Sequence, residues 1–292
     1  MKFRTEIKPE AAPFQLSASD RVLLVGSCFS DNIGSRLLLH GCPAVVNPCG
    51  VQYNPASIAS LLRAAMSGCV PQESFFSYNG RVRSWMFPQA FSGLTREEAE
   101  AKCGDAFAVL RDALLNSQTL IVTFGTAQVW RHLSSATSAY EGVVGNCHTV
   151  PSGEFLHTML SVEDIVEEWS KIIGELRSLN PGLKIIFTVS PVRHLNPSPR
   201  LNTLSKAALH LAVAQIVASN PTLNAYFPAY ELLIDDLRDY RFYAVDMSHP
   251  SVQAADYIFM QFVDCYYSAS DREAMRAAFS ASLRASHRPL LK

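Results

Sequence analysis

Short apolar runs that stop at glycine or proline recur along the chain, and this pattern constrains the fold more than any other feature. The clearest runs are residues 21–25, 119–124 and 184–189, which stop at Gly26, Gly125 and Ser190-Pro191. A short run without polar alternation, bounded by turn residues, is typical of a strand buried on both faces. Longer segments with helical spacing separate these runs. Strands that alternate with helices predict a parallel sheet covered by helices on both faces.

The remaining segments continue this alternation. Helices are expected from Ser30 or Asp31 as the cap to about residue 40, from Pro55 onward, and over 95–115, 162–179, 200–218 and 250–267. The starts are marked by capping residues or by a proline in the first turn. Short or extended strands are expected over 44–47, 223–227 and 240–245. Residues 71–91 are predicted to form a loop or a small hairpin. Residues 127–155 fit neither the helical nor the strand period. An irregular segment of that length inside a compact domain is typical of a functional element.

Length and charge exclude several classes of protein. The chain has 292 residues and a formal net charge of -1, whereas binding along nucleic-acid phosphates needs a basic excess. No apolar stretch approaches the roughly 18 residues of a membrane span, and residues 1–15 lack the apolar core of a secretory signal. Seven cysteines scattered along the chain do not suggest a disulfide framework. We therefore expect a soluble, cytoplasmic protein of enzyme size, with residues 1–292 forming one domain.

The turn after the first predicted strand carries two candidate nucleophiles. In open parallel sheets, ligands bind outside the carboxyl ends of the strands, and Gly26-Ser27-Cys28 follows such an end. A helix N-terminus stabilises anions, so a thiolate there is expected to have a lowered pKa. The alternative is a structural cysteine in a tight turn, because a nucleophile also needs a base within reach.

Asp246-Met247-Ser248-His249 supplies a carboxylate and an imidazole near the other end of the chain. A spacing of three lets the carboxylate bond one ring nitrogen and leaves the other free for proton transfer. The alternative is a capping aspartate beside a surface histidine. Together with a nucleophile at a strand end, the pattern favours acyl-transfer chemistry.

Several longer stretches resemble the GSCFA domain family. The signature lies at 25–34 (VGSCFSDNIG), with serine at position 30 where the family has alanine. Further matching stretches are 47–55, 123–127, 145–148, 190–193, Asn202 with Ser205 and Lys206, 226–231, 237–243 and 246–250. The resemblance therefore covers nearly the whole chain.

The GSCFA family is similar to the SGNH/GDSL hydrolase clan, and this implies a fold and a site. The fold is a flavodoxin-like three-layer α/β/α sandwich with a mainly parallel sheet, here with inserted segments. The resemblance puts Cys28 at the nucleophile position, with Ser27 as the alternative, and matches Asp246 and His249 to the catalytic pair. Gly50 corresponds to a glycine whose N–H binds the oxyanion.

The clan's asparagine in the oxyanion hole has no counterpart in Gly125-Thr126-Ala127. Candidate replacements are Thr126, Gln128 and Asn146, and the segment around Asn146 and His148 is expected to cover the site as a lid. His148, and Arg193 after a strand end, are candidates for substrate contact. Trp85, Phe87 and Phe91 are candidates for lining an acyl or sugar pocket.

These observations predict a hydrolase or acyltransferase that acts on a small ester, such as an O-acetylated carbohydrate, without metal or cofactor. The alternative is a fold that is not catalytic or that binds zinc. Cys28, Cys147, His148 and His249 are ligand types that zinc accepts, although their spacing matches no zinc finger.

Overall fold

The computed structural model describes residues 4–133, 142–195 and 198–286. Its central sheet has five strands in the order β2 (Ala44–Val46), β1 (Val22–Gly26), β5 (Thr119–Phe124), β8 (Lys184–Val189) and β9 (Asn224–Tyr226). Every neighbouring pair is parallel. Counted within the sheet, this is the 2-1-3-4-5 order of a flavodoxin-like fold. The predicted fold class is confirmed.

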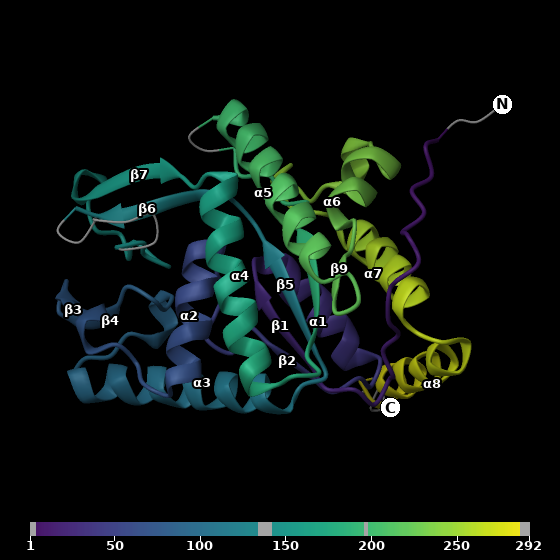
Figure 1. Ribbon diagram of the computed structural model, residues 1–292, viewed down its shortest axis with the longest axis horizontal. Helices are drawn as coiled ribbons and strands as arrows, with labels where there is room; N and C mark the ends of the chain where they lie inside the picture. Colours follow the sequence, from purple (N-terminus) through teal and green to yellow (C-terminus); the bar gives the residue numbers. More distant parts are fainter. Residues whose placement is uncertain (1–3, 134–141, 196–197, 287–292) are drawn as a thin grey trace, which may run out of the picture.

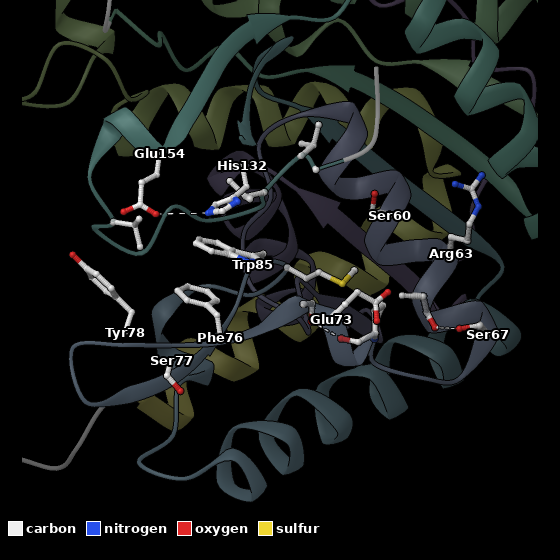
Figure 2. A pocket seen from close by; sticks show the side chains of 18 residues that line it. Ser60, Arg63, Ser67, Glu73, Phe76, Ser77, Tyr78, Trp85, His132 and Glu154 are labelled. Atoms are coloured by element: carbon white, nitrogen blue, oxygen red, sulfur yellow. Dashed lines mark hydrogen bonds and ion pairs between the residues drawn. The ribbon is translucent and has the colours of Figure 1, made fainter. Parts of the chain in front are cut away.

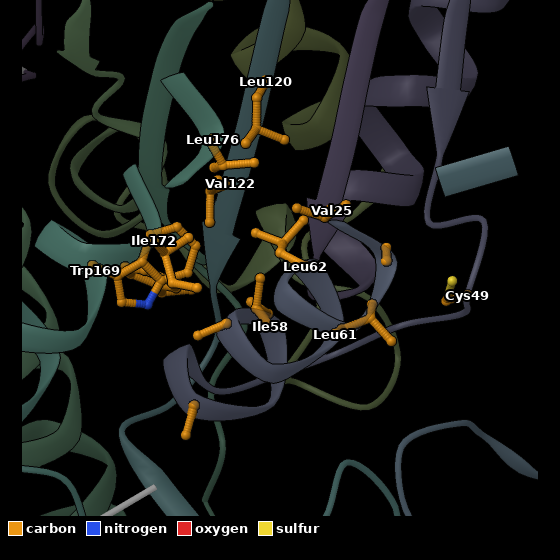
Figure 3. Close-up of a cluster of buried hydrophobic side chains, with 14 of the residues drawn as sticks. Val25, Cys49, Ile58, Leu61, Leu62, Leu120, Val122, Trp169, Ile172 and Leu176 are labelled. Carbon is orange, nitrogen blue, oxygen red and sulfur yellow. The ribbon is translucent and has the colours of Figure 1, made fainter. Parts of the chain in front are cut away.

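Helices cover both faces of the sheet (Figure 1). Helices α2 (Pro55–Ser67), α3 (Arg96–Asn116), α4 (Val162–Leu179) and α5 (Pro199–Ser219) pack on one face. Helices α1 (Cys28–Leu39), α6 (Ala229–Glu231), α7 (Val252–Tyr266) and α8 (Ala269–Ser286) lie on the other side. Successive side chains of a strand point to opposite faces. In β1, Leu23 and Val25 therefore join the first core and Val22 and Leu24 the second. Figure 3 shows Val25 and Val122 meeting α2 and α4 in the first core.

Two antiparallel hairpins stand outside the sheet. One pairs β3 (Phe75–Tyr78) with β4 (Arg81–Ser84), and the other pairs β6 (Gln128–His132) with β7 (Phe155–Met159). The first confirms the hairpin alternative for residues 71–91. The second begins inside residues 127–155, the stretch that fitted neither the helical nor the strand period. Its strands are only partly buried, so their hydrophobic alternation is weak. Part of that stretch, residues 134–141, lies outside the described residues.

Two predicted helix starts and one predicted strand differ from the structure. Helix α1 begins at Cys28 and is capped by Ser27, not by Ser30 or Asp31. Helix α7 begins at Val252, two residues after Pro250. Residues 240–245 form no strand, because the chain turns there through a short 3-10 helix, Tyr240–Phe242. None of the helices in the described ranges is long and apolar enough to cross a bilayer.

Candidate functional site

A cavity of about 780 Å³ lies among loops that follow the carboxyl ends of β1, β2, β5 and β8. The loop before α7 and a segment around residue 146 complete its walls. The predicted residues that line it are Cys28, Thr126, Gln128, Asn146, Arg193, Asp246 and His249. Ser27, Gly50 and His148 are not among the lining residues. Residues more than 200 positions apart therefore meet where parallel sheets bind their ligands.

The turn from β1 into α1 presents Cys28 and hides Ser27. Gly26 has φ +137°, and a Cβ there would lie 2.2 Å from the Thr123 carbonyl oxygen, so only glycine fits. Ser27 is 0% exposed, and its Oγ accepts the Phe29 N–H at 3.3 Å as the helix cap. Cys28, at the first position of the helix, is partly exposed and faces the cavity.

The pKa of Cys28 is raised, not lowered as the helix N-terminus alone led us to expect. Burial is the largest cause, and the nearby Asp31 carboxylate adds to it. The backbone N–H groups of Cys28 and Phe29 and the ammonium of Lys206 act in the opposite direction but do not outweigh burial. The resting side chain is therefore a thiol, and nucleophilic attack requires a base.

Asp246 and His249 form a bonded pair at the rim of the cavity. Asp246 Oδ2 lies 2.5 Å from His249 Nδ1, while Asp246 Oδ1 accepts the backbone N–H groups of Ser248 and His249 at 3.0 and 2.9 Å. These backbone bonds, followed by the imidazole bond, lower the pKa of Asp246 to about 2. The other ring nitrogen of His249 is left for the cavity. No hydrogen bond joins Cys28 to His249 in the described chain, and such bonds often tighten only when substrate binds.

Gly50 does not have the role that the resemblance implied. Its N–H donates to the Asn47 carbonyl at 2.7 Å and closes a turn, so it is not free to bind an oxyanion. With φ +80°, Gly50 is required by that turn, and a Cβ there would lie 2.3 Å from Pro88. The side chain of Asn47 instead supports the turn from β1 into α1, because it accepts the Gly26 N–H at 2.9 Å and donates to Asp31 at 2.7 Å.

The three candidate oxyanion side chains line the cavity with different bonds. Thr126 Oγ1 lies 3.0 Å from Ser205 Oγ and accepts the Gln128 N–H at 3.1 Å. Gln128 Oε1 is buried and has no partner among the described residues. Asn146 Oδ1 accepts the backbone N–H of His148 at 2.8 Å. The oxygen of Asn146 is thus occupied and its amide nitrogen is left for the cavity, whereas the unpartnered atom of Gln128 is an acceptor and cannot bind an oxyanion.

His148 lies in a small core behind the cavity wall, which differs from its expected contact with substrate. Its Nε2 is 2.7 Å from the Ser84 carbonyl oxygen, and its ring packs edge-on against Phe76. Burial lowers its pKa. Of the four possible zinc ligands, only Cys28, Cys147 and His249 line the cavity. Within the described ranges, no three His, Cys, Asp or Glu side chains are grouped so that they could hold a metal.

The loop after β8 contacts the Asp246–His249 loop on one side of the cavity and Tyr53 on the other. The Arg193 N–H donates to the Ser248 carbonyl at 3.1 Å. The neighbouring His194 packs edge-on against Tyr53, with ring centroids 5.6 Å apart. Burial lowers the pKa of His194 to about 4, and its Nε2 has no partner among the described residues. A neutral second imidazole therefore lies in the cavity.

Lys206 of α5 is a site residue that sequence reasoning did not single out, apart from its place in a family stretch. It is 2% exposed, and its Nζ donates to the carbonyls of Gly125 and Ser190, both at 2.6 Å. These carbonyls end β5 and β8, so one ammonium ties two loops of the site together. A signal was present, because Lys206 falls on the buried helical stripe with Leu209 and Val213.

We expect Lys206 to make stability depend on pH. Burial lowers its pKa from 10.5 to about 7. Between these values the unfolded chain holds the proton and the native chain does not, so the free energy of unfolding rises with pH. Relative to Lys206→Met, the wild type should gain up to ~1.4 kcal/mol per pH unit in this window. Urea unfolding of both proteins at several pH values measures this difference. Lys171→Met, which removes an exposed ion pair of α4, is the control. The prediction would be contradicted if the difference in unfolding free energy between the wild type and Lys206→Met changed with pH no more than the difference between the wild type and Lys171→Met.

A second cavity, of about 810 Å³, adjoins the first at Val144, which lines both. It lies between the two hairpins, and Figure 2 shows Phe76, Tyr78 and Trp85 on one side of it. The rings of Phe76 and Trp85 stack with centroids 3.6 Å apart. Trp85 thus lines this second cavity and is not among the residues that line the cavity with Cys28, whereas Phe87 is fully buried and Phe91 packs against the core.

Comparison with known proteins gives a family and several distant structural likenesses. The model of the GSCFA family matches residues 21–262. Among curated proteins, none matches the chain.

Three solved structures illustrate the likenesses. A carbohydrate esterase family 3 protein from Talaromyces cellulolyticus has 9% identity and a TM-score of 0.39 over 88% of this chain and 99% of that one. An acetyl esterase with a serine-to-alanine substitution and an acetate ion has 11% identity and a TM-score of 0.37, over 90% and 99%. An acetyl xylan esterase from the rumen bacterium Butyrivibrio proteoclasticus has 12% identity and a TM-score of 0.38, over 84% and 62%.

Proposed function

Since the chain belongs to the GSCFA family and its cavity holds both Cys28 and the Asp246–His249 pair, we propose that it transfers a short acyl group from a small ester. The observation that carries the proposal is this shared cavity at the carboxyl edge of a parallel sheet. An O-acetylated carbohydrate is the proposed substrate class. The acceptor is water in a hydrolase or a second alcohol in an acyltransferase.

The proposed reaction begins with proton transfer from the Cys28 thiol to His249. As the sulfur attacks the acyl carbon, a C–S bond forms and the carbonyl electron pair moves onto the oxygen. When this intermediate collapses, the ester C–O bond breaks and the alcohol leaves with the proton from His249. Water or a second alcohol then attacks the thioester, giving its proton to His249. The thiolate leaves and takes that proton back.

The electrostatics of the site support these roles. A thiol whose pKa is raised by burial needs a general base, and His249 is held in one tautomer by Asp246. Asp246, with a pKa of about 2, stays ionised over the working range of an enzyme and can stabilise the imidazolium that forms. Ser27 is left out of the proposal, because its Oγ is buried and caps α1.

The test is to trap the acyl group on the protein. We expect nitrophenyl acetate, mixed briefly with the protein and quenched in acid, to leave one acetyl group on the peptide that contains Cys28. Peptide mass spectrometry locates the label. Turnover of the ester with the label on Ser27, or with a label on neither residue, would contradict the proposed nucleophile.

The second candidate function is a fold without turnover or one that binds zinc. The absence of asparagine from Gly125-Thr126-Ala127 favours it, because acyl transfer needs that donor or a replacement. Elemental analysis separates the candidates: stoichiometric zinc together with no turnover of any acyl ester would favour the second.

We further propose that residues 1–292 form one cytoplasmic domain. Its proposed partners are small molecules, not nucleic acid or a membrane.

A further inference from the structure

The proposed reaction needs hydrogen-bond donors beside Cys28, and most backbone donors near it are already used. The N–H groups of Gly125 and Thr126 both donate to the Tyr53 carbonyl, at 2.8 and 2.9 Å. The Gly50 N–H is bonded to Asn47. The Cys28 N–H, at the first position of α1, remains and is directed toward its own sulfur. One backbone donor is therefore present, and a second donor must come from a side chain.

The two bonds to Tyr53 place the next residue, Asn54, beside the end of β5. That end is where the expected asparagine is missing. Asn54 is buried and lines the same cavity as Cys28. It follows β2 in the chain, so a neighbouring loop supplies an amide where the loop after β5 does not.

The orientation of the Asn54 amide is set by helix capping. Its Oδ1 accepts the Ser57 N–H at 2.8 Å as the cap of α2, which turns Nδ2 away from the helix. No residue of the described chain accepts a hydrogen bond from Nδ2. Since Nδ2 is not one of the buried atoms that lack a partner, it remains accessible from the cavity. The start of α2 is rigid, because Pro55 fills the first position and its carbonyl accepts the Trp169 indole N–H at 3.2 Å. A fixed donor costs little reorganisation during reaction.

We propose that the Asn54 Nδ2–H, together with the Cys28 N–H, binds the oxyanion formed during acyl transfer. This inference rests on the proposed function. It assigns to one side chain two separate tasks: Oδ1 caps α2 and Nδ2 acts on the substrate. Asn146 is the competing amide, because its Oδ1 is also bonded and its other end is also left for the cavity.

The two tasks can be separated by substitution. Asp and Ser cap helices about as well as Asn but have no amide donor, so Asn54→Asp and Asn54→Ser should keep the melting temperature of the wild type. We expect both to lower kcat for nitrophenyl acetate by about 10²–10³-fold with little change in KM. Asn54→Ser introduces no charge, so an equal loss of kcat in both variants excludes the new charge of Asn54→Asp as its cause. Thr95→Ala is the matched control, because it removes the cap of α3 far from the cavity; it should lower the melting temperature and keep kcat.

Each outcome bears on one of the two proposals. If the wild type turns over the ester and both Asn54 variants keep its kcat, the role of Asn54 is overturned while the proposed function stands. If Asn146→Asp alone shows the loss, the donor is Asn146, and our inference fails in the same way. If the wild type turns over no acyl ester and gains no acetyl group, the proposed function fails and this inference fails with it.

Discussion

Cys28→Ala should abolish ester turnover, with kcat lowered by about 10⁴–10⁶-fold. Removing the nucleophile of a catalytic triad leaves only the rate that binding and the oxyanion donors supply. Cys28 is a partly exposed side chain at the first position of α1 and lines the cavity. Initial rates with nitrophenyl acetate, and the loss of acetyl labelling, measure the effect.

Cys147→Ala is the matched control for this prediction. Cys147 is also a partly buried free cysteine that lines the cavity, and its pKa is likewise raised by burial. We expect this variant to keep its turnover. Ser27→Ala should lose about 1 kcal/mol of stability as the cap of α1 and retain most activity. A Cys28→Ser variant as active as the wild type, combined with an inactive Ser27→Ala, would overturn the assignment of Cys28.

His249→Gln and Asp246→Asn should each lower kcat by about 10³–10⁴-fold or more. The first removes the proposed base for the Cys28 thiol. The second leaves His249 Nδ1 without its carboxylate, so the imidazole loses the partner that sets its tautomer and stabilises its charge. Both side chains are about half exposed, 46% for His249, so neither change creates a cavity in the core. Losses in kcat with an unchanged melting temperature would therefore report chemistry rather than folding.

The comparison variant for the base is His194→Gln. His194 also lies in the cavity but is not bonded to a carboxylate, and burial holds its pKa at about 4. We expect its substitution to cost much less than that of His249. The opposite order, with His249→Gln active and His194→Gln inactive, would assign the base to His194. Because Asp246 has a pKa of about 2, its protonation should not contribute to any loss of activity between about pH 4 and pH 7.

Much of the scaffold was predictable because its signals are local. The strands β5 and β8 and helix α4 have the predicted bounds, since an apolar run or an amphipathic stripe is marked in the sequence at both ends. Helix α1 was placed three or four residues late, because Ser27, Ser30 and Asp31 are all good caps, and the Ser27 N–H bond to the Thr123 carbonyl is a long-range contact that the sequence does not mark. The hairpin β6–β7 was missed, because partly buried strands carry little alternation.

The sequence by itself determined the alternation of strands and helices, the Gly26-Ser27-Cys28 turn and the Asp246-x-x-His249 motif, because each depends on neighbours within a few positions. Only the tertiary structure decided which groups meet around Cys28. It placed His148 in a small core, with its ring against the Ser84 carbonyl, and brought Lys206 and Asn54 to the end of β5. These outcomes depend on hydrogen bonds between segments more than 60 residues apart in the chain. Residue spacing contains no information about which donor each of these carbonyls will accept.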